Sequence, residues 1–197
     1  MSGGIDIIEK PEWISWDEIH DVLIRAHKPN RDRGIVMRKP TLLGDEIAKE
    51  IENGKGTMLV AMDGTSVIGT AAILIRNSST WYNKGEYGYL CFASVLPEYA
   101  GKGVYRELCK EREKIAKGKG LKGLLFDTHH KNKHVIRINE RNGYKRVGAK
   151  LFTDHWNVVL FKWTEGCPFS DLTCSIRFFC GVLRMFLFKV KKRFSVD

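Results

Sequence analysis

The chain has 197 residues and a formal net charge of +10, from 33 Lys and Arg against 23 Asp and Glu. Its composition is that of an ordinary globular protein, which excludes a disordered chain, a collagen repeat and a disulfide scaffold. The positive charge indicates a polyanionic small ligand, an acidic partner or an anionic membrane surface. Because the basic residues are spread along the chain, we expect no nucleic-acid partner.

The sequence contains no recognisable targeting or membrane-spanning segment. The N-terminus lacks a basic start followed by a long apolar run, which a secretory signal would need. The most apolar stretch, 176–190, is interrupted by Arg177, Arg184 and Lys189, and it is shorter than the roughly 20 residues of a spanning helix. Five cysteines without a Cys-x-x-Cys pair suit a reducing compartment. We therefore expect a cytoplasmic protein.

In chain order, the first third of the sequence predicts one strand and two helices, at 5–8, 15–27 and 41–53. Ser15 with Glu18 three residues later is a capping pattern for the first of these helices. The polar, basic segment 28–39 is predicted to be a loop. Gly54 is placed to end the second helix.

From residue 57 onward the pattern changes to strands that alternate with helices. Strands are predicted at 57–62, 66–75, 87–95, 123–129, 144–152 and 157–163, and helices at 104–117 and 133–142. An Asp63-Gly64 turn joins the first two strands into a hairpin. The sequence therefore predicts an α/β (α+β) fold, a mixed sheet with helices on both faces.

The segment PEYAGKGVYREL, residues 97–108, combines two glycines with the start of a helix. Gly101 and Gly103 can adopt positive φ and let a ligand approach the backbone closely. The first N–H groups of the helix have no intrahelical partner and lie at the positive end of its dipole. Lys102 and Arg106 add charge, so the pattern indicates a site for a phosphate-type anion. The alternative is a plain glycine turn.

The ordered blocks around this segment resemble the GNAT superfamily of acyl-CoA-dependent N-acetyltransferases. The blocks are VLPEYAGKGVY at 95–105, FDTHHKN at 126–132 and INERNGY at 138–144, and the resemblance covers about residues 57–163. It implies a mixed, mostly antiparallel sheet of six to seven strands flanked by helices. We accordingly expect a GNAT-like domain at 1–163 and a C-terminal appendage at 164–197.

The resemblance implies acetyl-CoA as co-substrate, with no metal. The residues expected to bind it are Ala93, Ser94, Val95, Gly101, Lys102, Gly103, Val104, Tyr105, Arg106 and Asn132. Backbone N–H groups of 101–106 would hold the pyrophosphate, and 93–95 would pair with the pantetheine arm and polarise the thioester carbonyl. Asn132 would contact the pantetheine or cap the next helix. Ala100 replaces the family's Arg or Gln and Tyr105 its small residue, so we expect weaker binding.

In this family an amine attacks the thioester directly in a ternary complex, so the amine must first lose a proton to a general base or a water chain. Asp127 is the first candidate, against the alternative of a structural pair with a lysine. His155 is the second candidate. His129 and His130 are expected to lie on the solvated surface at a strand end. Asn139 occupies the position of the family's acidic Tyr, so another group or solvent must serve the leaving thiolate.

The acceptor is expected to be a small-molecule amine. Trp81 and Tyr82 are candidates for the wall of its site, with packing at the sheet edge as the alternative. An alternative hypothesis is that the protein is a catalytically silent CoA-binding or regulatory module. It is motivated by the departures from the family pattern at Ala100, Tyr105 and Asn139.

The C-terminal segment predicts a basic and aromatic helix over about 170–194. Arg177, Arg184 and Lys191 recur every seven residues and share one face. The remaining surface is too apolar to stand free in water. The helix either packs on the domain or on a second subunit, as in a homodimer, or lies on an anionic membrane surface. In the latter case the chain could serve as a scaffold for a partner or membrane.

Overall fold

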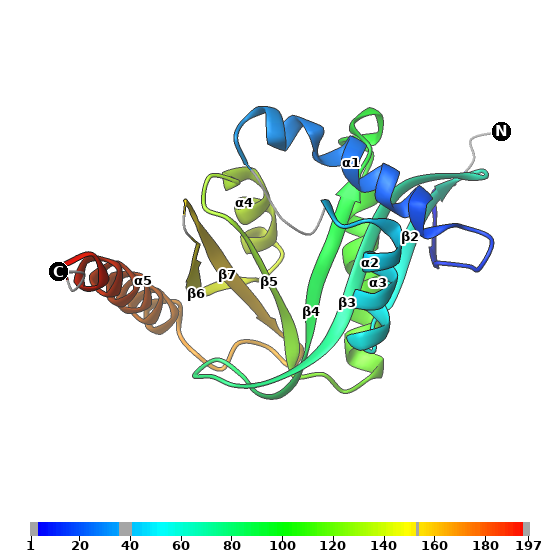
Figure 1. Cartoon of the computed structure of the whole chain (residues 1–197). Helices are drawn as coiled ribbons and strands as arrows, with labels where there is room; N and C mark the ends of the chain where they lie inside the picture. Colours follow the sequence, from blue (N-terminus) through cyan, green and yellow to red (C-terminus); the bar gives the residue numbers. More distant parts are fainter. Residues whose placement is uncertain (1–3, 36–40, 153, 195–197) are drawn as a thin grey trace. The chain divides into compact units, whose positions relative to one another are not determined.

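The computed structural model describes residues 4–35, 41–152 and 154–194, the last seven of these by their backbone alone. Within these residues it has seven strands in the order β1-β2-β3-β4-β5-β7-β6 and five α-helices (Figure 1). The mixed, mostly antiparallel α/β fold expected from the sequence is confirmed. The contacts divide the chain into two compact units, 1–124 and 125–197, which are described in turn.

The first unit contains four strands, three α-helices and one short 3-10 helix. In chain order these are β1 (Asp6–Glu9), α1 (Trp16–Asp32), α2 (Gly44–Asn53), β2 (Thr57–Asp63), β3 (Ser66–Ser79), β4 (Lys84–Val95), the 3-10 helix (Pro97–Tyr99) and α3 (Val104–Gly118). Each of β1 to β4 pairs antiparallel with its neighbour along the chain. The predicted hairpin turn is confirmed, since Asp63 pairs with Ser66 and Gly64 has a φ of +61°.

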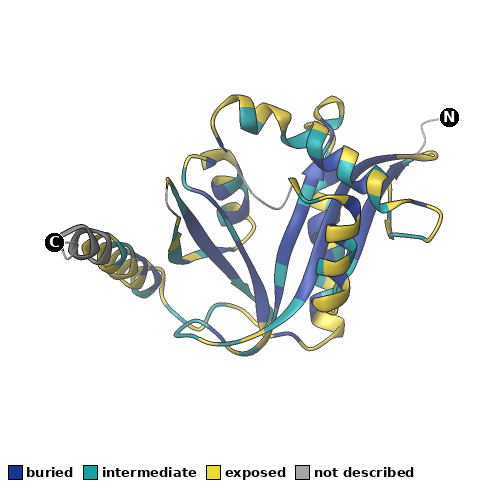
Figure 2. Cartoon of the chain, in the orientation of Figure 1, coloured by how far each residue is buried: buried dark blue, intermediate teal, exposed yellow. Residues whose placement is uncertain are grey.

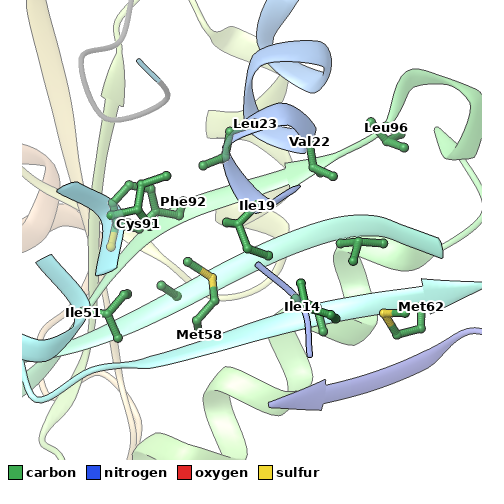
Figure 3. Packing of buried hydrophobic residues seen from close by; sticks show 14 of the residues in the cluster. Ile14, Ile19, Val22, Leu23, Ile51, Met58, Met62, Cys91, Phe92 and Leu96 are labelled. Atoms are coloured by element: carbon green, nitrogen blue, oxygen red, sulfur yellow. The ribbon is translucent and has the colours of Figure 1, made fainter. Parts of the chain in front are cut away.

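Strand β2 is buried on both faces because its side chains alternate between two apolar clusters. Met58, Val60 and Met62 belong to the cluster beneath α1 and α2 (Figure 3). Leu59 and Ala61 belong to the cluster with Val104 and Leu108 of α3. The sheet of this unit therefore carries helices on both faces, as predicted.

Helix α1 runs further than its sequence indicates. Ser15 caps it as predicted, with Oγ accepting the Glu18 N–H at 3.0 Å. The prediction of a loop from residue 28 is wrong for its first part, because the helix continues to Asp32 and includes Pro29. Pro29 removes one backbone donor, and packing of Ile19, Val22 and Leu23 against the sheet outweighs that loss.

Other predicted boundaries also differ from the structure. Strands β3 and β4 extend beyond the predicted 75 and 87, since Arg76–Ser79 pair with Lys84–Tyr87 across the hairpin. These residues are mostly polar, so cross-strand hydrogen bonds rather than hydrophobic alternation make them strands. Helix α2 begins at Gly44 instead of 41 and ends before Gly54 as predicted.

The second unit contains β5 (Gly123–His129), which starts at the boundary, α4 (Lys133–Arg141), β6 (Lys145–Leu151), β7 (Trp156–Trp163) and α5 (Asp171–Phe194). Strands β6 and β7 form an antiparallel hairpin. Helix α5 packs on β6 through the buried side chains of Cys174 and Phe178. Its first turn is tied to β6 by an ion pair of 2.7 Å between Lys145 and Asp171.

Candidate active site

Strand β4 carries a β-bulge three residues before its end. Its pairing with β3 runs from Ala72 opposite Cys91 to Thr70 opposite Ser94, so Phe92 and Ala93 share a single partner position. Phe92 adopts a φ of +51°, which is unusual for an aromatic residue. A bulge of this kind turns backbone N–H and C=O groups out of the ladder. It falls within the segment 93–95 expected to hold the pantetheine arm and the thioester.

Two buried hydroxyl groups hold the bulge in place. Thr70 Oγ1 donates to the Phe92 carbonyl at 2.7 Å and lies 2.8 Å from Ser94 Oγ. Both side chains are buried. The Ser94 hydroxyl is therefore directed into the sheet, and only the backbone of Ser94 remains for a cofactor.

His27 on α1 contacts the same bulge. It hydrogen-bonds the backbone of Ala93, and its Nδ1 is buried without a partner among the described residues. Burial, with the charge of Arg31 second, lowers its pKa to about 4, so His27 is neutral at neutral pH. The sequence prediction missed this residue. Its position four residues after Leu23, on the buried face of α1, was the available signal.

The segment between β4 and α3 is held by side chains of α1 and β2 and by a contact within the segment. Glu98 pairs with Arg25 of α1 at 2.9 Å. The Tyr99 hydroxyl donates to Asp63 at the end of β2 at 2.8 Å, and this bond is the main cause that raises the pKa of Tyr99. The Lys102 ammonium lies 4.4 Å from the centre of the Tyr99 ring. These contacts explain why a Pro-Glu-Tyr sequence precedes the glycines.

Gly101 and Gly103 have φ values of +79° and +84°. Space is not the constraint at Gly101, where an added Cβ would meet nothing within 4 Å, so the conformation itself selects glycine. Helix α3 begins at Val104 with no side-chain cap on its first N–H groups. An uncapped helix of 15 residues behind two positive-φ glycines suits a phosphate group.

The basic side chains around this turn are not equally available to bind a phosphate. Arg106 is exposed and lies 3.3 Å from Glu107, which also accepts from Lys110. The Lys110 hydrogen bond is the main cause that lowers the pKa of Glu107. Arg106 would have to exchange Glu107 for a phosphate, whereas exposed Lys102 lies directly beside the glycines.

Trp81 and Tyr82 lie in the turn that joins β3 to β4, with their rings 5.5 Å apart in a T-shaped arrangement. Asn83 stabilises this turn by donating to Ser78 and to the Gly85 carbonyl. The turn precedes Lys84, the first residue of β4, so at about 3.3 Å per residue it lies roughly 30 Å along the strand from the bulge at Phe92. The structure does not bring these aromatic residues together with 93–95.

In the second unit Asp127 is engaged by two partners. One carboxylate oxygen accepts from Lys150 of β6 and the other from Asn157 of β7 at 2.7 Å. The Asp127 side chain is 8% exposed. The structural pairing with a lysine, weighed as an alternative above, is present, and a proton-accepting role would require Asp127 to give up one of these bonds.

Three histidines form a column of stacked rings in this unit. The order is Phe152, His155, His129, His130 and Trp156, with neighbouring ring centres 4.5–5.0 Å apart. The expectation of a solvated His129 is wrong, because it is 3% exposed, and burial, followed by the charges of His130 and His155, lowers its pKa. Among the described residues no three His, Cys, Asp or Glu side chains gather as metal ligands.

The partners of the histidines assign their tautomers. His129 Nδ1 accepts the Lys131 N–H at 3.0 Å, whereas His130 Nδ1 donates to the Trp156 carbonyl. His155 Nδ1 faces the Asp154 carboxylate at 2.7 Å and must therefore carry a proton. Nε2 is then the basic nitrogen of His155, with Asp154 positioned to stabilise the imidazolium.

Two buried asparagines complete the predicted set. Asn132 is the N-cap residue of α4, as one alternative expected, but its side chain makes no capping hydrogen bond, and its Nδ2 donates instead to Thr128 at 3.1 Å. Asn139, at the position of the family's Tyr, is 1% exposed and donates to the Val135 carbonyl at 2.8 Å. Neither side chain can act as an acid.

The Acetyltransferase (GNAT) family model matches residues 16–144, well over half of the sequence. This chain belongs to the GNAT acetyltransferase family. As a GNAT enzyme it is an acyl-CoA N-acyltransferase by family, and the matched region includes α1, the β4 bulge and the glycine turn. No curated protein matches the sequence significantly.

Solved structures show the same GNAT fold. An acetyltransferase from Streptococcus agalactiae is 20% identical, with a TM-score of 0.63 over 81% of this chain and 98% of the other. A GNAT protein from Desulfovibrio desulfuricans is 13% identical, with a TM-score of 0.66 over 82% and 99%. A GNAT acetyltransferase from Elizabethkingia anophelis, solved with acetyl-CoA bound, is 13% identical, with a TM-score of 0.57 over 81% and 97%. At these identities the likeness concerns the fold.

Proposed function

We propose that this GNAT enzyme transfers an acetyl group from acetyl-CoA to the primary amine of a small molecule by direct attack in a ternary complex. The observation that carries the proposal is the uncapped start of α3 behind Gly101 and Gly103, immediately after a strand whose end is bulged. A pyrophosphate suits the first feature and an acylated thiol arm suits the second.

The chain's own groups divide the work as follows. The backbone N–H groups at the start of α3 bind the pyrophosphate, with Lys102 as the adjacent cation. The backbone of 93–95 binds the pantetheine arm, and Asn132 is a further candidate contact. Bound acetyl-CoA supplies an activated acyl group, which the bulge would orient and polarise. Trp81 and Tyr82 can contact the acceptor only if the acceptor molecule is long enough to reach from the bulge to the turn between β3 and β4.

For the general base we favour His155 over Asp127. Asp154 holds the His155 tautomer whose Nε2 can take a proton, whereas both Asp127 oxygens already accept hydrogen bonds.

The five cysteines are free thiols, which supports a cytoplasmic setting.

A catalytically silent CoA-binding module is the second candidate. The observation that favours it is Asn139, which is buried and bonded to a backbone carbonyl where a family member would offer a Tyr acid. Release of free CoA thiol in the presence of amines separates the two functions, because a silent module binds acetyl-CoA without turnover.

Thermal unfolding with and without millimolar acetyl-CoA tests the site itself. A ligand at 100 times its dissociation constant adds about 2.7 kcal/mol to the free energy of unfolding and raises the melting temperature visibly. Gly103→Glu should abolish that rise by adding bulk and negative charge at the phosphate position.

Gly120→Glu is the matched control. Gly120 also has positive φ, at +63°, and lies just beyond the other end of α3 with open space around it. Backbone strain and added charge should therefore be similar, while acetyl-CoA binding survives. Equal loss in both variants, or no response of the unaltered protein, would refute the proposed site.

A further inference from the structure

Helix α5 exposes a continuous apolar stripe, defined by Leu172, Ile176, Phe179, Leu183, Phe186 and Leu187. The first five positions are separated by four, three, four and three residues, which places them on one side of the helix. Their exposed fractions range from 43% for Phe186 to 69% for Leu172 and Phe179. Figure 2 shows the coloured part of α5 as largely exposed.

The stripe lies opposite the face that α5 uses for packing. At about 100° per residue, Cys174 points roughly 170° away from the centre of the stripe, and Phe178 roughly 130° away on the flank opposite to the arginines. These two residues are buried against β6. Packing on β6 therefore accounts for one side of α5. The stripe stays largely exposed, although its Phe186 contacts Trp156 edge-on, with the ring centres 6.5 Å apart. Exposed apolar side chains in such number are costly to maintain in water.

Basic residues border the stripe and determine which occupant it suits. Arg177 and Arg184 are exposed, and both lie at about 110–130° from the centre of the stripe, on the same flank. From residue 171 to 194 the sequence holds six basic residues, which are Arg177, Arg184, Lys189, Lys191, Lys192 and Arg193, against the single acidic Asp171. The long arginine side chains can reach outward while the stripe faces an apolar medium.

We propose that α5 is a membrane-binding element that lies flat on an anionic bilayer, with the stripe inserted at the headgroup boundary and the basic flank on the lipid phosphates. An apolar arc bordered by cations is the pattern of an in-plane helix. No helix in the described ranges has the length and hydropathy to cross a membrane.

A second copy of this chain is the principal competitor for the stripe. Pairing two stripes would bring together two copies of α5, each with six basic residues and one acidic residue in its sequence. Like charges brought together in this way oppose association. Anionic lipid neutralises the same charges, and for that reason the bilayer is the better occupant.

Co-sedimentation of the full-length protein with vesicles tests this inference. We expect binding to phosphatidylcholine vesicles that contain phosphatidylserine, weak binding to phosphatidylcholine alone, and a decline with added salt. The triple variant Ile176→Gln/Phe179→Gln/Leu183→Gln should bind at least about a hundredfold more weakly. Arg177→Gln/Arg184→Gln should lose about fivefold for each arginine.

Trp13→Gln is the matched control, because Trp13 is an apolar side chain in the first unit with 66% exposure. Circular dichroism and the acetyl-CoA melting response should be unchanged in every variant, since all altered side chains are exposed. The proposal is overturned if the unaltered protein does not bind phosphatidylserine vesicles. It is also overturned if the triple variant binds these vesicles as tightly as the unaltered protein. A dimer in sedimentation velocity that the triple variant dissociates, without vesicle binding, would assign the stripe to a second copy instead.

Discussion

The hydroxyl of Thr70 donates a hydrogen bond of 2.7 Å to the carbonyl oxygen of Phe92, the bulged residue of β4. Thr70→Val keeps the shape of the side chain and leaves that buried carbonyl without its donor. We expect a loss of about 1–3 kcal/mol in the free energy of unfolding and weaker acetyl-CoA binding, because the bulge relaxes. Urea denaturation and calorimetric titration with acetyl-CoA measure the two effects.

Thr70→Ser is the control, since it retains the hydroxyl and removes one methyl group. Its acetyl-CoA affinity should stay close to that of the unaltered protein. If the valine variant loses stability but binds acetyl-CoA normally, Thr70 supports the sheet and has no part in the cofactor site.

The bond between Tyr99 and Asp63 should matter for the cofactor more than for the fold. Tyr99→Phe removes a single hydroxyl that holds the turn before the glycines. We expect a several-fold rise in the acetyl-CoA dissociation constant and a loss of about 1 kcal/mol in stability. Asp63→Asn, whose amide oxygen can still accept from Tyr99, should bind acetyl-CoA more tightly than Tyr99→Phe does.

The two candidate bases can be separated by turnover. His155→Asn should lower kcat by about 10²–10⁴-fold, the usual contribution of a general base, and leave acetyl-CoA affinity unchanged. Asp127→Asn should reduce kcat far less and lower stability, because Lys150 loses its ionised partner. The reverse order of effects on kcat would make Asp127 the base. Asp154→Asn should also lower kcat, because it removes the carboxylate that holds the proton on His155 Nδ1 and thereby keeps Nε2 free to accept one.

Acid should destabilise the protein through its buried histidines. His27 has a pKa of about 4 in the folded state against 6.5 for an ordinary histidine. The unfolded chain therefore binds the proton first, and stability falls as pH drops from about 6.5 to about 4, by about 3 kcal/mol in total. The lowered pKa of His129 acts in the same direction.

Urea midpoints at pH 7.5 and pH 5 measure this loss. His27→Gln can still donate to Ala93 and does not titrate, so its midpoint should fall less between the two values of pH. The urea midpoint of His134→Gln, a variant at an exposed histidine, should fall as much as that of the unaltered protein. Parallel losses in all three proteins would show that His27 does not control the acid response.

Most of the fold followed from local patterns. The hairpin at Asp63-Gly64, the cap at Ser15 and the glycine turn depend on a few neighbouring residues, and each was predictable from them. The burial of His129 was not predictable, because His129 stacks on His155 and the neighbouring His130 stacks on Trp156, so each contact joins residues 26 positions apart.

The amino-acid sequence was sufficient to predict a GNAT enzyme with Gly101 and Gly103 at the start of α3. The positive φ at these glycines reflects steric limits that act within a single residue, so the turn could be predicted from the sequence. Only the tertiary structure revealed the bulge at Phe92, its fastening by Thr70, the contact of His27 with Ala93 and the engagement of Asp127 by Lys150. These features depend on pairing between distant segments, and no local propensity encodes a partner 22 or more residues away.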